Sequence, residues 1–209
     1  MTYYGRWTYK FEEAARQGAA AALIVHDTAP ASYGWNVVEN SFTGPQLYMQ
    51  TANNGADQTA ANGWLSNAAA RRLLAAGGQD LDALTRAAGQ RGFRAVPLGL
   101  TASLGFDNAI RNTASRNVIG ILPGRTRPNA TVLYTAHWDH LGTCREQGED
   151  RICNGAIDNA TGTAALVALA EAHARAGPAE RSLVFAAVTA EESGLLGSAY
   201  YAANPPFPL

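Results

Sequence analysis

The chain has 209 residues, which is enough for one large hydrophobic core or two smaller ones. Hydrophobic residues make up 47% and charged residues 16%, a balance that excludes an intrinsically disordered chain. The net charge of -1 excludes a general electrostatic attraction to nucleic acid or to an anionic membrane surface. The longest apolar run, residues 19–25, is much shorter than the about 20 residues that cross a bilayer.

Before residue 105, short predicted elements are separated by Gly, Asn and Pro. Apolar spacing predicts helices where residues recur every three or four positions, and apolar runs predict strands. Asp80 is the expected N-cap of the second of two consecutive helices. In chain order we predict a helix at 8–18, a strand at 20–26, a polar loop at 36–44, a strand at 46–50, helices at 63–76 and 81–88, and an extended strand at 96–104.

After residue 105, strands and helices alternate, which predicts an α/β fold with a mostly parallel sheet flanked by helices. The last predicted strand has a continuous apolar centre at 183–188, which suits a sheet buried on both faces. The predicted elements are strands at 117–122 and 131–136, an apolar helix at 161–176, a strand at 181–189 and a helix at 197–203.

The two cysteines, Cys144 and Cys153, lie close together in one polar loop. Such a pair can form a disulfide, contribute to a metal site or remain as two thiols. A disulfide is the favoured interpretation, because the loop between them has no packing of its own and a cross-link would restrict it.

Three polar clusters lie at or just after the ends of apolar segments in the second half of the chain. Ligands of open α/β sheets bind at such strand ends. Imidazole together with several carboxylates is a ligand set that zinc accepts. The clusters are Thr-Ala-His-Trp-Asp-His-Leu-Gly at 135–142, Asn-Gly-Ala-Ile-Asp-Asn-Ala-Thr-Gly at 154–162 and Thr-Ala-Glu-Glu-Ser-Gly-Leu-Leu-Gly-Ser at 189–198.

Each residue type in these clusters has a chemical use. His137 offers a neutral ring nitrogen to a metal, and Asp139 can hold the other ring nitrogen and fix the tautomer. Asp158 can bridge two ions through its two carboxylate oxygens. Glu191 and Glu192 would face apart in an extended stretch, but in a tight turn one can ligate while the other moves protons.

Structural explanations exist for each cluster taken alone. A single histidine at a strand end is more often structural than a ligand, and Glu191-Glu192 fits the start of a helix. Asp158-Asn159 before a helix fits an N-cap. Together, with glycine-rich flanks, the clusters favour a site. Among the other histidines, we interpret His26 as structural and His140 as lining the site without ligating.

The order and content of these clusters resemble the zinc aminopeptidase family that includes bacterial leucyl aminopeptidases and glutamate carboxypeptidase II. The resemblance covers about residues 115–209. The segment around residues 17–25 is similar to a protease-associated domain, which members of this family often carry as an insert. The resemblance implies a smaller α+β protease-associated domain at 1–104 and the first part of a zinc peptidase domain at 105–209.

Carried over residue by residue, the resemblance makes His137 a ligand of one zinc ion and Glu192 a ligand of a second. Asp158 becomes the bridge between both ions, and the bond that follows it is expected to be a cis peptide. Glu191 becomes the general base that deprotonates a bridging water as it attacks an N-terminal peptide bond. Asp139 becomes a supporting catalytic residue.

The sequence departs from the family pattern after Glu192, where neither Asp nor His occurs before residue 209. The family has one further Asp ligand and one further His ligand, so we expect a fragment in which each ion lacks a ligand. Such a fragment, made alone, is expected to be inactive, poorly soluble and weak in binding zinc. We also expect an open edge on the strand at 181–189.

The resemblance further implies a peptide substrate and a periplasmic or secreted location, although no signal peptide is visible at the start of the chain. It leaves the oligomeric state open. Carboxypeptidase or glutaminyl cyclase specificity in the same fold remains an alternative. A non-catalytic protease-associated module that docks a protein partner is an alternative of another class.

Overall fold

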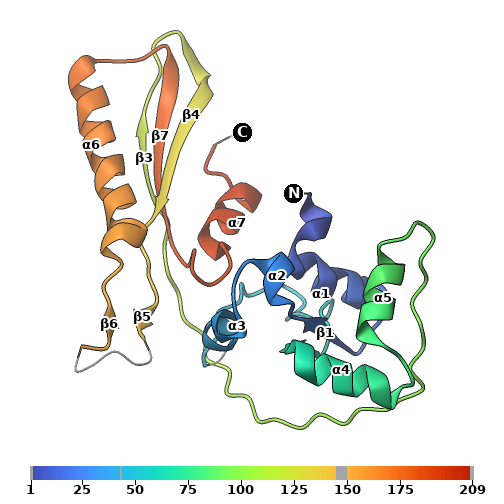
Figure 1. The fold of residues 1–209 in the computed structure, drawn as a ribbon. Helices are drawn as coiled ribbons and strands as arrows, with labels where there is room; N and C mark the ends of the chain where they lie inside the picture. The colour runs from blue at the N-terminus through green and yellow to red at the C-terminus, as the bar shows by residue number, and fades with distance from the viewer. Residues whose placement is uncertain (1, 43, 145–149, 208–209) are drawn as a thin grey trace. The chain divides into compact units, whose positions relative to one another are not determined.

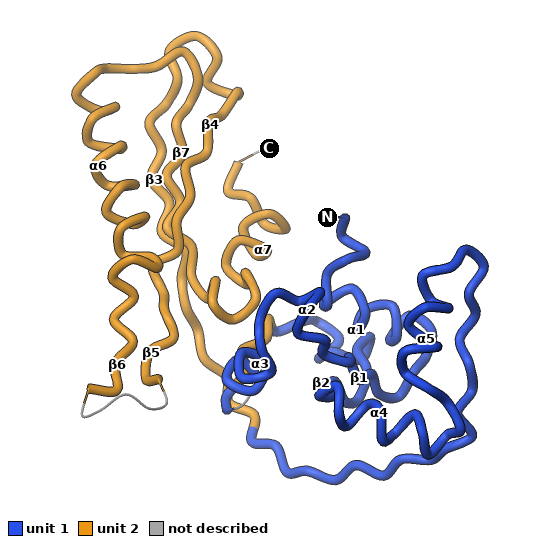
Figure 2. Tube along the Cα trace, viewed as in Figure 1, with its two compact units in different colours: residues 1–45, 50–109 blue, residues 46–49, 110–209 orange. Residues whose placement is uncertain are grey.

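A computed structural model describes residues 2–42, 44–144 and 150–207. The chain forms two compact units, the first made of residues 1–45 and 50–109 and the second of residues 46–49 and 110–209 (Figure 2). None of the helices among the described residues is long and apolar enough to cross a membrane.

The first unit contains a two-stranded parallel sheet and several short helices (Figure 1). Its packing is largely aromatic, because the rings of Trp7, Phe11, Phe42 and Trp64 lie 5.3–6.5 Å apart in a connected group. The elements are a 3-10 turn η1 (Tyr3–Gly5), α1 (Trp7–Arg16), β1 (Ala21–Val25), α2 (Thr28–Ala31), α3 (Trp35–Phe42), β2 (Ala61–Leu65), α4 (Asn67–Ala76) and α5 (Leu81–Ala88).

His26 follows β1 and is 4% exposed. Its ring lies 5.3 Å from that of Tyr33 and 6.0 Å from that of Trp35, measured between centroids. Thr28 Oγ1 is 3.4 Å from its Nε2 atom. This enclosed aromatic environment agrees with the structural interpretation of His26.

The predicted polar loop at 36–44 is wrong, because residues 35–42 form helix α3. Asn residues have low helix propensity, but Val38 is only 3% exposed and Phe42 packs on Trp7. The sequence also predicts strands at 46–50 and 96–104, and neither forms. Neither stretch pairs with another strand in the described residues, and an unpaired extended segment gains no ladder hydrogen bonds.

The helix predicted at 63–76 divides into strand β2 and helix α4. Ser66 marks the boundary, since its Oγ accepts the backbone N–H of Ala69 at 3.3 Å and caps α4. Trp64 and Leu65 belong to the strand and pair in register with Ile24 and Val25 of β1. The helix predicted at 81–88 is confirmed as α5, and Asp80 caps it through Ala83.

The second unit is built on a three-stranded sheet with the order β3-β7-β4. The pair β4 and β7 is parallel, whereas β3 and β7 are antiparallel, so a mostly parallel sheet is not observed in the described residues. The elements are β3 (Val118–Leu122), β4 (Arg127–His137), β5 (Gly142–Thr143), β6 (Ile152–Cys153), a π-type turn η2 (Ala156–Ala160), α6 (Thr161–Ala176), β7 (Arg181–Val188) and α7 (Leu196–Ala203).

Strand β7 is the central strand, and residues 182–186 along it are buried in succession. Alternate side chains point to opposite faces, so Leu183 and Phe185 face helix α6, and Val184 lies on the other face with 1% exposure. Burial on both faces is confirmed. The expected open edge on this strand is wrong, because β3 and β4 occupy its two edges.

The core between the sheet and α6 contains Ala136, Leu166, Leu183 and Phe185. The ring of Phe185 stacks on Tyr134 with centroids 5.4 Å apart. Phe185→Ala is expected to lower the free energy of unfolding by about 3–5 kcal/mol in urea denaturation, because it opens a cavity in this core. Leu133→Ala, at a side chain 41% exposed, is the matched control and should cost far less. Equal losses would contradict this core.

Strands β5 and β6 form a short antiparallel hairpin between β4 and the turn η2. Cys144 and Cys153 at its ends are joined by a disulfide, with Cα atoms 5.7 Å apart, and the predicted pairing is confirmed. The hairpin thus connects the segment after β4 to the segment before α6 by a covalent bond as well as by the chain.

Candidate metal centre

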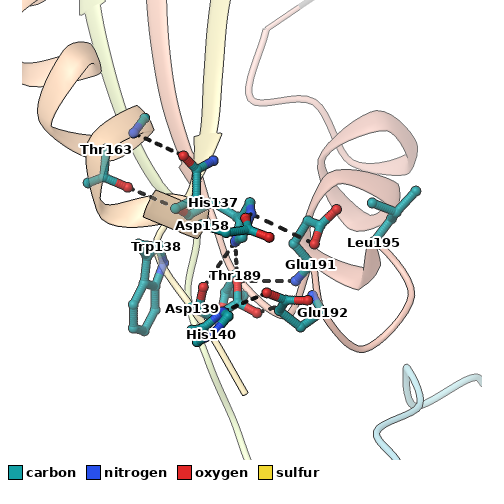
Figure 3. A network of polar contacts seen from close by, with 12 residues as sticks. His137, Trp138, Asp139, His140, Asp158, Thr163, Thr189, Glu191, Glu192 and Leu195 are labelled. Atoms are coloured by element: carbon teal, nitrogen blue, oxygen red, sulfur yellow. Dashed lines mark hydrogen bonds and ion pairs between the residues drawn. The ribbon is translucent and has the colours of Figure 1, made fainter. Parts of the chain in front are cut away.

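The carboxyl ends of β4 and β7 meet at one edge of the sheet, because the two strands are parallel and His137 pairs with Val188. The ladder continues one residue further, since the N–H of Trp138 donates to the carbonyl of Val188 at 3.0 Å. The segments 138–140 and 189–195 therefore leave the sheet side by side (Figure 3). These are two of the three clusters singled out in the sequence.

The third cluster reaches the same place through the start of α6. Asp158 lies in the turn η2, and the peptide bond between Asp158 and Asn159 is cis, as expected. Asp158 Oδ1 is 2.9 Å from Nε2 of His137. On the adjoining turn of α6, the hydroxyl of Thr163 donates to the carbonyl of His137 at 2.9 Å and ties this helix to the strand end.

Glu191 and Glu192 lie in a tight turn, which allows both side chains to reach the site. The N–H groups of Gly194 and Leu195 donate to the carbonyl of Glu191 at 3.0 and 2.9 Å. The side chain of Glu191 approaches His137, with Oε2 3.8 Å from Nε2. Glu192 instead contacts His140, with 2.7 Å between Oε1 and Nδ1 (Figure 3).

Glycine is required where helix α7 begins beside this turn. A Cβ atom at Gly197 would lie 2.2 Å from the carbonyl oxygen of Thr189 and 2.6 Å from Oδ1 of Asn117. Asn117 itself joins the two segments, accepting from the N–H of Thr189 at 3.0 Å and donating to the carbonyl of Gly197 at 2.8 Å. The turn that carries both glutamates is thus fixed at its two ends.

Asp139 supports the site differently from the sequence prediction. His137 Nδ1 is 3.0 Å from the backbone carbonyl of Asp139 but 3.8 Å from its carboxylate. The carboxylate instead accepts the backbone N–H groups of Glu191 at 3.1 Å and Glu192 at 3.4 Å. Asp139 therefore orients the histidine through its backbone and holds the glutamate turn through its side chain.

The side chains of His137, Asp158 and Glu192 each offer one ligand atom, and these atoms lie within 4.8 Å of one another. His137 is 8% exposed, whereas the side chain of Asp158 is 68% exposed and that of Glu192 is 21% exposed. Among the described residues this is the one group of three or more such side chains at that spacing. The three residues predicted as ligands are brought together.

The orientation of the His137 ring fits a metal. A carbonyl oxygen can only accept, so Nδ1 carries a hydrogen that it donates to Asp139. In the neutral ring Nε2 then has a lone pair, and it faces the carboxylates of Asp158 and Glu191. The Nε2 lone pair and a carboxylate oxygen are both acceptors, so their close contact requires either a cation between them or a proton on the ring. A divalent ion meets that need, and a metal-bound histidine commonly donates its other N–H to a carbonyl in this way.

The same contacts shift the protonation of His137 in the metal-free protein. Burial lowers the pKa of the ring, but the hydrogen bond to the Asp139 carbonyl, the charge of Glu191 and the hydrogen bond to Asp158 together outweigh it. The pKa of His137 is therefore raised above its usual value. In the metal-free protein, a proton on Nε2 takes the place of a metal cation between the ring and the carboxylates of Asp158 and Glu191.

A cavity of about 380 Å³ lies beside the cluster. It adjoins the candidate ligands through Asp139 and His140, and the exposed ring of Trp138 forms part of its wall. The N–H of the Trp138 ring donates to the carbonyl of Arg116 at 3.1 Å, which fixes the indole. The other lining residues are Asn154, Gly155, Asn159, Ala160, Thr163, Ala164 and Val167.

Comparison with known proteins finds one family whose model matches the segment that carries this candidate site. Residues 117–208 match the model of peptidase family M28. The matched segment contains His137, Asp158, Glu191 and Glu192 together with the sheet that positions them. The match supports a peptidase of family M28 in this segment.

Two curated relatives are similar in sequence to part of this chain. Aminopeptidase YwaD of Bacillus subtilis (strain 168) is 33% identical over 94 residues, which cover 44% of this chain and 18% of the relative. Aminopeptidase NAALADL1 of Mus musculus is 31% identical over 107 residues, covering 49% of this chain and 13% of the relative. The chain thus spans less than a fifth of the length of either relative. No solved structure gives a significant match.

Proposed function

We propose that this chain carries part of the active site of a metal-dependent exopeptidase that removes N-terminal residues from peptides. The observation that carries the proposal is the orientation of the His137 ring. Its Nδ1 donates to a backbone carbonyl, and its Nε2 faces carboxylates. The match of residues 117–208 to family M28 and the names of the two aminopeptidase relatives support it.

In this proposal zinc is the metal, and two ions are bound in the complete protein. His137 would hold one ion, Glu192 would hold the other, and the carboxylate of Asp158 would contribute to both. Bound zinc supplies polarisation of the scissile carbonyl and acidification of the attacking water. The side chain of Asp158 is 68% exposed, so its carboxylate is accessible to such ions.

Glu191 is the proposed general base. Its carboxylate is 34% exposed, lies 3.8 Å from the His137 ring and stands outside the group of three converging ligand atoms. A carboxylate that borders the metal without being needed as a ligand can accept a proton from water and pass it to the leaving amine. Asp139 fixes the backbone of Glu191 by accepting its N–H, while the side chain remains free to turn.

We also propose that the chain made alone binds zinc only weakly and does not hydrolyse peptides. Its described residues bring one imidazole and two carboxylates to the site, whereas two catalytic ions need about three protein ligands each. A periplasmic or extracellular location is a further part of the proposal. The disulfide supports it, because disulfides persist in oxidising compartments. Recovery of the native protein with two free thiols would contradict that location.

The test joins metal binding to activity. The purified chain should bind zinc weakly in equilibrium dialysis, and the complete product of the gene should hydrolyse aminoacyl anilides. Chelation should stop that hydrolysis, and added zinc should restore it. A zinc-binding protein that cleaves only C-terminal residues or cyclises glutamine would favour the carboxypeptidase or cyclase alternative. A protein that binds no zinc would favour a non-catalytic binding module.

A further inference from the structure

Among the described residues of the second unit, His140 is the one histidine that contacts a proposed metal ligand without being a proposed ligand itself. Its Nδ1 lies 2.7 Å from Oε1 of Glu192, and the two side chains are 22% and 21% exposed. It stands outside the group of converging ligand atoms. The contact therefore acts on the orientation of Glu192 and adds no atom to the cluster.

His140 also contacts the segment that leads to Asp158. A Cβ atom at Gly155 would lie 2.8 Å from Cβ and Cγ of His140, so glycine is needed there for the backbone to approach the His140 side chain. Gly155 has a φ of +61°, a conformation that glycine adopts without strain. The imidazole thus lies between the loop before Asp158 and the turn that carries Glu192.

The other contacts of this turn leave the Glu192 carboxylate free to rotate. Asp139 holds the backbone N–H of Glu192 at 3.4 Å, which fixes the main chain. A glutamate side chain still has three rotatable bonds, and ordering them costs entropy when a metal binds. A hydrogen bond to one carboxylate oxygen removes that freedom beforehand and leaves the second oxygen for a metal.

We propose that His140 is a positioning residue that donates its Nδ1 hydrogen to Glu192 Oε1 and holds this carboxylate in its metal-binding orientation. This inference rests on the proposed function, since it needs Glu192 to be a ligand. It assigns to His140 a role through Glu192 and no direct bond to the metal.

Two substitutions separate positioning from packing. His140→Asn keeps an N–H donor at nearly the position of Nδ1, whereas His140→Leu keeps bulk and removes the donor. We expect His140→Leu to weaken zinc binding by the purified chain about 10–100-fold, the range found for residues that hold metal ligands. His140→Asn should recover most of that affinity. His173→Leu is the matched control, because His173 packs its ring on Tyr134 at 5.9 Å.

Zinc affinity is measured by competition with a chromogenic chelator, and cobalt(II) absorption reports the ligand geometry. The melting temperature of the metal-free chain gives a readout of structure alone. We expect His140→Leu to change the zinc affinity and the cobalt(II) spectrum. Its metal-free melting temperature should stay close to that of the unchanged chain.

Three results would overturn the inference: an unchanged zinc affinity in His140→Leu, equal losses in the Leu and Asn variants, or a fall in metal-free stability that accounts for the lost affinity. Equal losses would indicate direct ligation by His140. If the unchanged chain binds no zinc, or if Glu192→Gln binds it as tightly, the proposed function and this inference both fail. These outcomes differ from a failure of His140 alone, in which the unchanged chain binds and Glu192→Gln does not.

Discussion

Glu191→Gln is expected to abolish hydrolysis of aminoacyl anilides by the complete gene product while leaving its bound zinc in place. Glutamine keeps the size and shape of the side chain and one acceptor oxygen, but it cannot accept a proton at neutral pH. Because general-base catalysis contributes about 10²–10⁴-fold, the turnover number should fall by at least that factor. Steady-state kinetics and metal analysis of the same preparation measure both quantities.

A matched control is available on helix α6. Glu171 is exposed there and pairs with Arg175, so Glu171→Gln removes one carboxylate from the same unit without touching the site. It should leave both activity and zinc content unchanged. Loss of zinc from Glu191→Gln would show that Glu191 is a ligand, and retained turnover would show that another group is the base.

His137→Ala is expected to reduce zinc binding by the purified chain by more than about 100-fold. Loss of a residue that merely holds a ligand costs about 10–100-fold in affinity, and here a proposed ligand itself is removed. The loss should exceed that of any other histidine, since Nε2 of His137 faces two carboxylates at 2.9 and 3.8 Å. Isothermal titration with zinc gives the affinity directly.

Folding must be checked in this variant, because His137 is 8% exposed and its removal leaves a space at the end of β4. Circular dichroism of the metal-free variant provides that check. His173→Ala removes an imidazole from the same unit and serves as the matched control. A folded His137→Ala chain that binds zinc with unchanged affinity would refute the ligand assignment.

The sequence predicts the elements of the second unit more closely than those of the first. The strand at 181–189 and the helix at 161–176 have long apolar patterns, and both form within one residue of the predicted ends. Helix α3 was not predictable in the same way. Its sequence is rich in Asn, and burial of Val38 in the folded unit stabilises it.

Local sequence patterns also do not predict the order of strands in a sheet. Nothing in the apolar run at 183–188 indicates that two earlier strands flank it, because pairing depends on contacts between residues about 50 or more positions apart. The expected open edge on β7 was wrong for this reason. The same limit explains why a mostly parallel sheet was predicted, since strand direction on the β3 side is set by the chain path.

In the candidate site, too, local sequence patterns predict some features and not others. His137, Asp158 and Glu192 each follow or precede a strongly patterned element, so their convergence follows from the placement of strand ends. The contact between His140 and Glu192 joins positions 52 residues apart and has no sequence signal beyond the presence of a second histidine. Asp139 was singled out correctly as a neighbour of His137, but its carboxylate binds the glutamate turn.

The central place of β7 has a consequence for synthesis on the ribosome. Strands β3 and β4 precede β7 in the chain, yet in the sheet each pairs with β7 and not with the other. Until Val188 has left the exit tunnel, both strands lack their native hydrogen-bonding partner while their apolar side chains are already exposed. Nascent chains stalled between Ala176 and Arg181 should therefore aggregate or recruit holding chaperones. The glutamate turn emerges only a few residues later, so the three candidate ligands come together in the same step that closes the sheet.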